Sequence, residues 1–292
     1  MRRRMLAIFV LLCLFSVSAF AETDGVVVDL INHPDASWSF QEGAEILEIV
    51  FPPVQGADAC ILRLGDRVLL VDAATPGQHD RVAAALAYMG ITHVDTGFNT
   101  HPHDDHIGGF EVLTDAVTLG ELVITFPEDT NNAMINALRV MREQNVPVTH
   151  AQNGDLLPFG DVRIEVIQSD TFWFNENCRS AMLRVEYGER SLLLAADVGT
   201  DRQNELLEQS PEKLPADIFK YPHHAVDPAG WRFLKTIGGE MTVITNSRSR
   251  VKDADKDAKW RGLTPVYTCY GMVRLRTDGH IWVADQIRLD VD

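Results

Sequence analysis

The chain has 292 residues, 46% of them hydrophobic and 23% charged, so it can bury a sizeable core. This composition excludes a disordered or fibrous protein. Its 26 lysine and arginine residues face 42 aspartate and glutamate residues, a formal net charge of −16. Because nucleic-acid binding relies on basic side chains that displace phosphate counterions, net charge gives no support for it.

The first residues have the order of a secretory signal peptide. A basic segment, Arg2-Arg3-Arg4, precedes an apolar run, and Ala19-Phe20-Ala21 fits a cleavage site. We therefore expect a signal peptide over residues 1–21, a mature chain that begins at Glu22, and a periplasmic or secreted location. A transmembrane anchor is the alternative, but the run is shorter than the roughly 20 residues that span a bilayer. Lipid attachment at Cys13 is a weaker alternative, because small residues do not precede it.

Three cysteines follow the expected cleavage site: Cys60, Cys178 and Cys269. In an oxidising compartment, an odd number of cysteines leaves at least one thiol free or bound to a metal. A framework of disulfides is therefore not expected.

Short β-rich runs alternate with helical segments over the rest of the chain, and no low-complexity stretch divides it, so residues 22–292 are expected to form one domain. In the first half, the patterns predict strands at 44–51, 59–64, 68–71, 93–98 and 122–126, and helices at 78–88, 107–113 and 133–144. Asp72 ends the third of these strands.

The second half repeats this order. It predicts strands at 162–167, 181–186, 191–196, 217–221, 241–245, 272–276 and 281–284, and helices at 203–209 and 231–237. Two such halves imply an α/β fold with two sheets and helices outside them, a four-layer αββα sandwich. The charged segment 247–262 is expected to be a solvated loop or surface helix. Phe172, Trp173 and Phe174 could line the pocket, but a place in the hydrophobic core is favoured.

Five of the ten histidines fall in two tight clusters, His101, His103 and His106, and His223 and His224. In a loop after a strand, residues two apart can point the same way. His101 and His103 can therefore bind one metal ion while Asp105 and His106 turn to a second. Such mixed imidazole and carboxylate ligands suit zinc, with manganese or iron as alternatives. A polar surface loop is the alternative without a metal, but this density of ligands favours one or two bound ions.

The spacing of His101, His103, Asp105 and His106 resembles the H-x-H-x-D-H signature of the metallo-β-lactamase superfamily. The resemblance extends over nearly all of residues 47–283, and its closest form is the hydrolase domain of ComEC-type DNA-uptake proteins. Segments 55–59, 70–72, 177–180, 187–188, 194–197 and 216–224 carry it in order. The resemblance implies a metallo-β-lactamase-like αββα sandwich and metal-dependent hydrolase activity.

The resemblance implies further site residues. Asp197, directly after a buried strand, matches the aspartate that bridges two metal ions, although such a residue is otherwise a turn residue or a helix N-cap. Either His223 or His224 matches the last ligand, and the other would face the substrate; we favour His224 as the ligand. Asp72 matches an aspartate that orients a metal-binding histidine, and a strand-end turn residue is the equal alternative.

Two departures from the family pattern concern the site. The third histidine that most catalytic members supply to the first metal is absent, and Asn177 or Cys178 stands in its region. Asparagine is typical of the ComEC-type branch, whereas a thiolate is a strong zinc ligand. In addition, Ala225 and Val226 replace the Gly-Ser pair that usually follows the two histidines of that branch, which removes a hydroxyl that could contact phosphate.

Two neighbouring metal ions can share a hydroxide at neutral pH that attacks a phosphoryl or carbonyl centre. Asp105 or Asp197 would orient this hydroxide, and His223 with Lys220 or Arg179 would contact the substrate's negative charge. The first hypothesis is therefore an exported metal-dependent hydrolase of a phosphoester or phosphodiester. A β-lactamase or lactonase is a second hypothesis, which the missing histidine disfavours. A metal-binding module without turnover is a third.

The charge of the chain also bears on the substrate. Because an acidic protein attracts long nucleic acid poorly, we expect a small phosphoester or the end of a phosphate-bearing polymer as the substrate, with long nucleic acid second. After the signal peptide, no apolar run is long enough for a stable membrane span.

Overall fold

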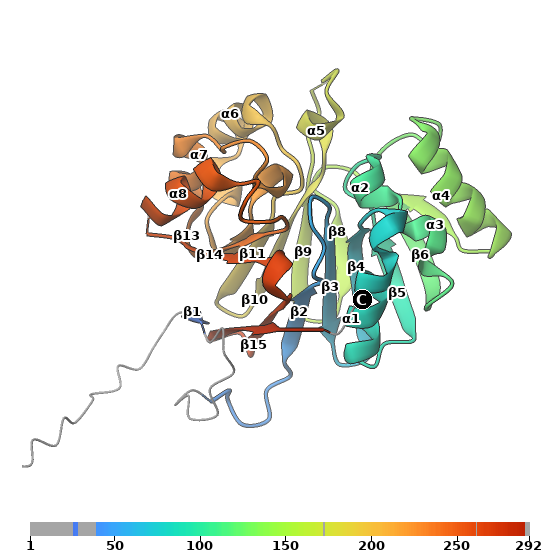
Figure 1. The fold of residues 1–292 in the computed structure, drawn as a ribbon, viewed down its shortest axis with the longest axis horizontal. Helices are drawn as coiled ribbons and strands as arrows, with labels where there is room; N and C mark the ends of the chain where they lie inside the picture. The colour runs from blue at the N-terminus through green and yellow to red at the C-terminus, as the bar shows by residue number, and fades with distance from the viewer. Residues whose placement is uncertain (1–25, 29–38, 172, 261, 290–292) are drawn as a thin grey trace, which may run out of the picture.

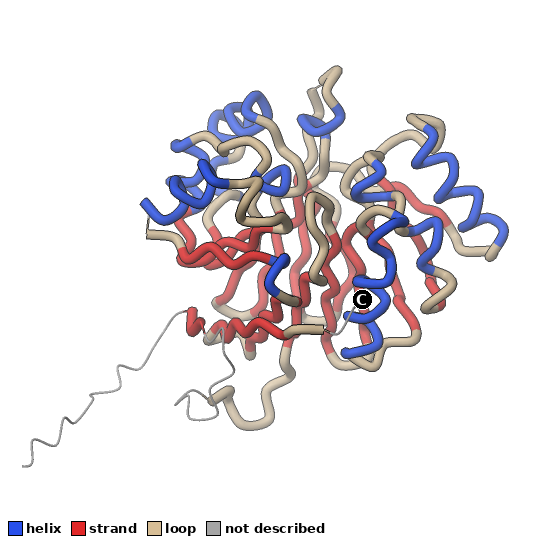
Figure 2. The backbone as a smooth tube through the Cα atoms, viewed as in Figure 1, coloured by secondary structure: helices blue, strands red, loops and turns tan. Residues whose placement is uncertain are grey.

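The computed structural model describes residues 26–28, 39–171, 173–260 and 262–289. The predicted signal peptide, residues 1–21, and the predicted start at Glu22 lie outside these residues. Two β-sheets stack face to face, and helices cover their outer surfaces (Figure 1). Figure 2 shows the strands at the centre and the helices on both sides. The predicted αββα sandwich is therefore confirmed.

The first sheet has nine strands in the order β1-β16-β15-β2-β3-β4-β5-β6-β7. Neighbours from β16 to β4 are antiparallel, and those from β4 to β7 are parallel. The strands are β1 (Val26–Val28), β2 (Leu47–Phe51), β3 (Ala59–Leu64), β4 (Arg67–Ala73), β5 (His93–Phe98), β6 (Thr118–Ile124), β7 (Val148–His150), β15 (Met272–Thr277) and β16 (Trp282–Ile287). The helices on this side are α1 (His79–Tyr88), α2 (Asp104–Ile107), α3 (Phe110–Leu113) and α4 (Asn132–Glu143).

The second sheet has seven strands in the order β14-β13-β12-β11-β10-β9-β8. It is antiparallel from β8 to β11 and parallel from β11 to β14. The strands are β8 (Leu156–Phe159), β9 (Val162–Ile167), β10 (Met182–Tyr187), β11 (Arg190–Leu194), β12 (Ala216–Lys220), β13 (Gly238–Ile244) and β14 (Thr264–Tyr267). The short helix α5 (Glu176–Arg179) precedes β10, and α6 (Thr200–Gln209), α7 (Trp231–Ile237) and α8 (Lys252–Trp260) cover the outer face.

The apolar core lies in three layers, because each sheet is buried on both faces. Alternate residues of β2 belong to different layers: Ile49 packs between the two sheets, while Val50 faces the helices of the first sheet. This alternation follows from the period of two in a β-strand. Double burial also explains why the central strands have almost uninterrupted apolar sequences.

The predicted helix over 107–113 is two short helices, α2 and α3, separated by Gly108 and Gly109. A Cβ atom at Gly109 would lie 1.8 Å from the backbone oxygen of Ala73. Only glycine therefore lets the chain pass so close to the end of β4. The close approach keeps the histidine-rich loop beside Asp72.

The final hairpin, β15 and β16, follows the strands of the second sheet in the sequence but belongs to the first sheet. β15 pairs with β2 in the first sheet, so that sheet combines both ends of the described chain. The charged segment 247–262 contains α8, whose Ala254 and Ala258 are buried. The prediction of core packing is wrong for Phe174, a residue that is 96% exposed, and Phe172 lies outside the described residues.

Candidate metal centre

The predicted ligands lie on loops and short helices at one edge of the stacked sheets. His101 and His103 lie in the turn between β5 and α2, and Asp105 and His106 lie in α2 itself. Asp197 follows β11, and His224 lies in the 3-10 helix Pro222–Ala225 after β12. The carboxyl ends of neighbouring parallel strands meet at the same edge of a sheet, which is where open α/β folds bind their ligands. The topology thus brings together residues that are more than one hundred positions apart.

Asp72 organises the histidine-rich loop from the end of β4. Its carboxylate accepts hydrogen bonds from the Asn99 side chain at 3.0 Å, the Thr100 amide at 2.8 Å and the Thr100 hydroxyl at 2.7 Å. The same carboxylate lies 2.8 Å from His106 Nδ1. His106 Nε2 is therefore the nitrogen left to face the centre, and Asp72 lies beside a predicted ligand as the sequence indicates.

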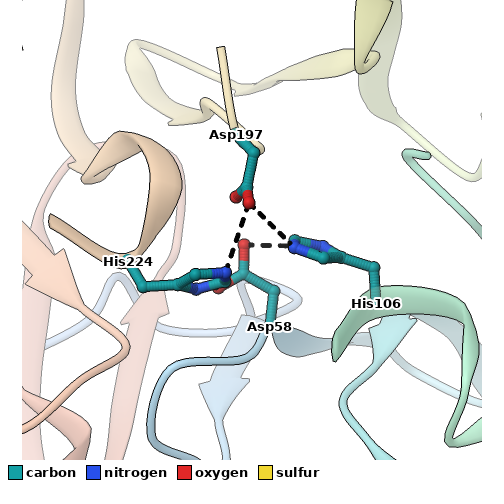
Figure 3. A group of neighbouring side chains, drawn as sticks. All are labelled: Asp58, His106, Asp197 and His224. Atoms are coloured by element: carbon teal, nitrogen blue, oxygen red, sulfur yellow. Dashed lines mark hydrogen bonds and ion pairs between the residues drawn. The ribbon is translucent and has the colours of Figure 1, made fainter. Parts of the chain in front are cut away.

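Four buried side chains converge at the centre (Figure 3), and their potential ligand atoms lie within 4.8 Å of one another: Asp58, His106, Asp197 and His224. Asp197 Oδ2 lies 3.2 Å from His106 Nε2 and 3.3 Å from His224 Nε2. Asp105, which is partly exposed, places Oδ2 3.3 Å from the same His224 nitrogen. The predicted ligands Asp105, His106, Asp197 and His224 are thus brought together.

The two histidine nitrogens at this centre fit a metal ion. His106 Nε2 and His224 Nε2 are buried, and neither has a hydrogen-bond partner among the described residues. Because nearly all buried polar atoms in proteins are partnered, two such atoms facing one carboxylate indicate a missing partner. Imidazole nitrogens with carboxylate oxygens are the donor set that zinc and related transition metals take.

Asp58 is a site residue that the sequence did not single out. Its Oδ1 lies 3.0 Å from His224 Nδ1 and accepts a 2.6 Å hydrogen bond from the Thr245 hydroxyl. Asp58 therefore holds the far nitrogen of His224, as Asp72 holds that of His106. Its only sequence signal is a carboxylate just before the buried strand β3, in a segment that supported the family resemblance.

Lys220, expected with Arg179 as the alternative to contact substrate, is instead buried against two carboxylates of the centre. The side chain is buried beneath the centre, where its ammonium forms an ion pair with Asp58 and lies 3.4 Å from Asp197 Oδ1. It also donates to the backbone oxygen of Ala196 at 2.9 Å. Lys220 thus anchors the carboxylates of the centre from below.

His101 and His103 form the second group of predicted ligands. His101 Nε2 lies 3.1 Å from His103 Nδ1 and 3.9 Å from Asp197 Oδ2. His101 Nδ1, on the other edge of the ring, lies 3.0 Å from the Thr100 hydroxyl. Asp197 therefore lies between two groups of donors, which is the arrangement that a bridging aspartate requires.

Asn177 and Cys178, the two candidates for the missing histidine, lie in different surroundings. Asn177 Nδ2 lies 3.4 Å from His223 Nε2, and its buried Oδ1 has no partner within the described part of the chain. The Cys178 thiol instead packs against the first turn of α6, near Gly199. Only the Asn177 side chain therefore approaches the predicted site residues.

His223 and His224 differ in burial. His224 is buried with Nε2 at the centre, whereas the His223 side chain is 31% exposed, with Nε2 3.9 Å from Asp197 Oδ2. Both residues and Ala225 have positive φ angles of 47° to 58°, a conformation that glycine adopts without strain. The strained turn directs His224 inward and leaves His223 at the rim. This arrangement fits the sequence-based preference for His224 as the ligand.

The buried charges of the metal-free centre shift the pKa values of its histidines. Burial opposes a charge on His106, but Asp197 and Asp72 outweigh it and raise the pKa of His106 to about 10. Burial likewise opposes a charge on His224, whose pKa is nevertheless raised by Asp197 and Asp58. Burial and the neighbouring His106 lower the pKa of His101. A metal ion therefore has to displace protons from His106 and His224.

These pKa shifts predict how the stability of the metal-free protein depends on pH. The raised pKa of His106 stabilises the fold below the ordinary value of 6.5, and this contribution disappears as the pH rises through about 10. Chelator-treated protein is thus expected to lose thermal stability over this interval, whereas metal-loaded protein should not, because the ion replaces the protons. Thermal unfolding of both forms across the interval is the measurement. The same loss of thermal stability in the metal-free and metal-loaded forms would contradict the assignment of His106 as a metal ligand.

Comparisons with known proteins agree with this geometry. A family model described as the metallo-beta-lactamase superfamily matches residues 53–235. ComE operon protein 3 of Bacillus subtilis (strain 168) is 26% identical over 168 residues, which are 56% of this chain. The match spans only 21% of the length of that protein. The chain is therefore a distant homologue of part of ComE operon protein 3.

Two solved structures share the fold. The metallo-beta-lactamase fold protein YhfI from Bacillus subtilis has a TM-score of 0.51 at 15% identity, over 76% of this chain and 95% of that one. CmlA, a diiron beta-hydroxylase from Streptomyces venezuelae, also has a TM-score of 0.51, at 14% identity over 80% of this chain and 54% of that one. At these identities the likeness shows the αββα fold alone. Among the described residues, no helix combines the length and apolarity needed to cross a membrane.

Proposed function

The chain belongs to the metallo-beta-lactamase superfamily, and on that premise we propose that it is an exported metal-dependent hydrolase of phosphoesters, with phosphodiesters as the first choice. One observation carries the hydrolase assignment. His106 Nε2 and His224 Nε2, both buried and without a partner among the described residues, face Asp197 Oδ2 at 3.2 and 3.3 Å. Ligand atoms in this arrangement fit a transition-metal ion, and we propose zinc ahead of manganese or iron.

The side chains around the centre have distinct roles in this proposal. A metal ion bound there acts as a Lewis acid and lowers the pKa of water. Asp105, partly exposed above the buried ligands, orients the attacking water by accepting its hydrogen bond. His223 Nε2 lies at the rim and gives a proton to the leaving oxygen, while Asp227 Oδ2, 3.3 Å from Nδ1, holds the ring.

Two features support a phosphoester as the substrate. The Asn177 amide and His223 Nε2 lie 3.4 Å apart beside Asp197, so they can donate hydrogen bonds to two oxygens of one phosphoryl group. The formal charge of −16 provides little attraction along a nucleic-acid chain. A small phosphoester, or the end of a phosphate-bearing polymer, therefore suits this protein better than long DNA.

Export to the periplasm or the medium is part of the proposal, and it rests on the order of the segments in residues 1–21. N-terminal sequencing of the protein recovered outside the cytoplasm is expected to begin at Glu22. A recovered chain that retains residues before Ala19 would contradict this part of the proposal.

A substrate screen of metal-loaded protein tests the chemistry. It compares a bis-aryl phosphate, a phosphorylcholine ester, single- and double-stranded DNA, a cephalosporin and a lactone. We expect the aryl phosphodiester to be cleaved fastest, Asp105→Ala to lose this activity, and the matched variant Asp104→Ala, at an exposed neighbouring carboxylate, to keep it. Preferred turnover of the cephalosporin or lactone would overturn the substrate class. Full activity in Asp105→Ala would overturn the assigned role of Asp105.

A further inference from the structure

His103, a predicted ligand outside the buried cluster, has an acidic partner on a different element. Glu176, the first residue of α5, places Oε2 2.9 Å from His103 Nε2. Both side chains are about one-third exposed, at 28% and 35%. Neither the family pattern nor the sequence assigned Glu176 a role, and it stands in the region where the third histidine is missing.

The contact follows a rule that the other site histidines obey. Asp72 holds the far nitrogen of His106, Asp58 and Thr245 hold that of His224, and the Thr100 hydroxyl holds that of His101. In each case, an oxygen on one edge of the imidazole leaves the opposite nitrogen to face the centre. Glu176 completes this set for His103.

We propose that Glu176 is a positioning residue for His103 at the first metal site, an inference that rests on the metal centre proposed above. Its carboxylate accepts the Nε2 proton of His103, so the Nδ1 lone pair faces His101 Nε2, 3.1 Å away. A carboxylate partner also makes a ligating imidazole more basic. Glu176 thereby raises the metal affinity of a site that has two histidine ligands and lacks the usual third one.

The geometry distinguishes this role from that of a direct ligand. An imidazole cannot direct both nitrogens at one ion, and the Nδ1 edge of His103 is the one that faces His101. Glu176 lies at the Nε2 edge, on the other side of the ring. The Glu176 carboxylate therefore orients His103 and does not itself bind the metal ion.

The test compares Glu176→Gln and Glu176→Ala with wild type and with Glu143→Ala, a control at an exposed glutamate that pairs with Arg139. Zn²⁺ affinity is measured by competition with a chromophoric chelator. Because outer partners of ligating histidines contribute about 10- to 100-fold to metal affinity, Glu176→Ala should lose this much affinity at the first metal site, that of His101 and His103, and not at the second. Glu176→Gln retains an acceptor for the Nε2 proton and should lose less.

A second measurement reports on the hydrogen bond without a metal. Long-range ¹H–¹⁵N NMR spectra of chelator-treated protein should show His103 protonated at Nε2 in wild type and in Glu176→Gln, but as a mixture of tautomers in Glu176→Ala. Unchanged zinc affinity in Glu176→Ala would overturn the proposal, as would equal losses in both variants. Wild type that shows the Nε2 tautomer but takes up no zinc would instead overturn the proposed function.

Discussion

Asp197→Ala is expected to lose both bound metal and hydrolase activity. The Oδ2 atom of Asp197 lies within 4 Å of four histidine nitrogens, those of His101, His106, His223 and His224. The variant lacks the carboxylate that lies between His101 on one side and His106 and His224 on the other. The loss of metal affinity should therefore exceed the roughly 10- to 100-fold effect of removing an outer partner.

Elemental analysis of reconstituted protein, with circular dichroism to verify folding, measures this effect. Asp201→Ala is the matched control, because it removes an exposed carboxylate from the first turn of the following helix, α6. If folded Asp197→Ala bound as much metal as Asp201→Ala, the bridging role would have to be abandoned. His101 with His103, and His106 with His224, would then have to bind metal ions independently of Asp197.

Lys220→Met is expected to destabilise the metal-free protein by about 3–5 kcal/mol, the usual result of removing one partner from a buried ion pair. The Lys220 side chain is 2% exposed, and its ammonium contacts Asp58, Asp197 and the backbone oxygen of Ala196. These three acceptors satisfy all three donors of the ammonium. Burial opposes the charge, but Asp58 and Asp197 outweigh it and raise the pKa of Lys220 above its ordinary value.

Urea unfolding of chelator-treated protein measures the loss for Lys220→Met. Lys213→Met is the control, because Lys213 is 28% exposed and pairs with Glu165 near the surface. A partly exposed pair of this kind contributes about 0–1 kcal/mol. Equal losses in the two variants would show that the ion pairs beneath the centre do not stabilise the fold.

Most strands and the histidine loop were predictable because their signals are local. A central strand has a short apolar run that ends at a turn, and β3 and β9 match the predicted bounds for that reason. The short β7, β8 and β14 and the four-residue α5 escaped prediction, because each depends on a neighbouring strand or loop rather than on its own periodicity. The two-glycine break between α2 and α3 likewise requires the nearby backbone of Ala73.

The sequence by itself determined the two-sheet fold and the residue types at the centre, since histidine and aspartate concentrated directly after apolar strands are typical of a metal site. Only the tertiary structure decided which nitrogen each imidazole presents, because that depends on partners distant in sequence. Asp58 lies 166 positions from His224, and Glu176 reaches His103 from another loop. Burial also changed the role assigned to Lys220, because its charge is neutralised by Asp58 and Asp197, two carboxylates of the centre itself.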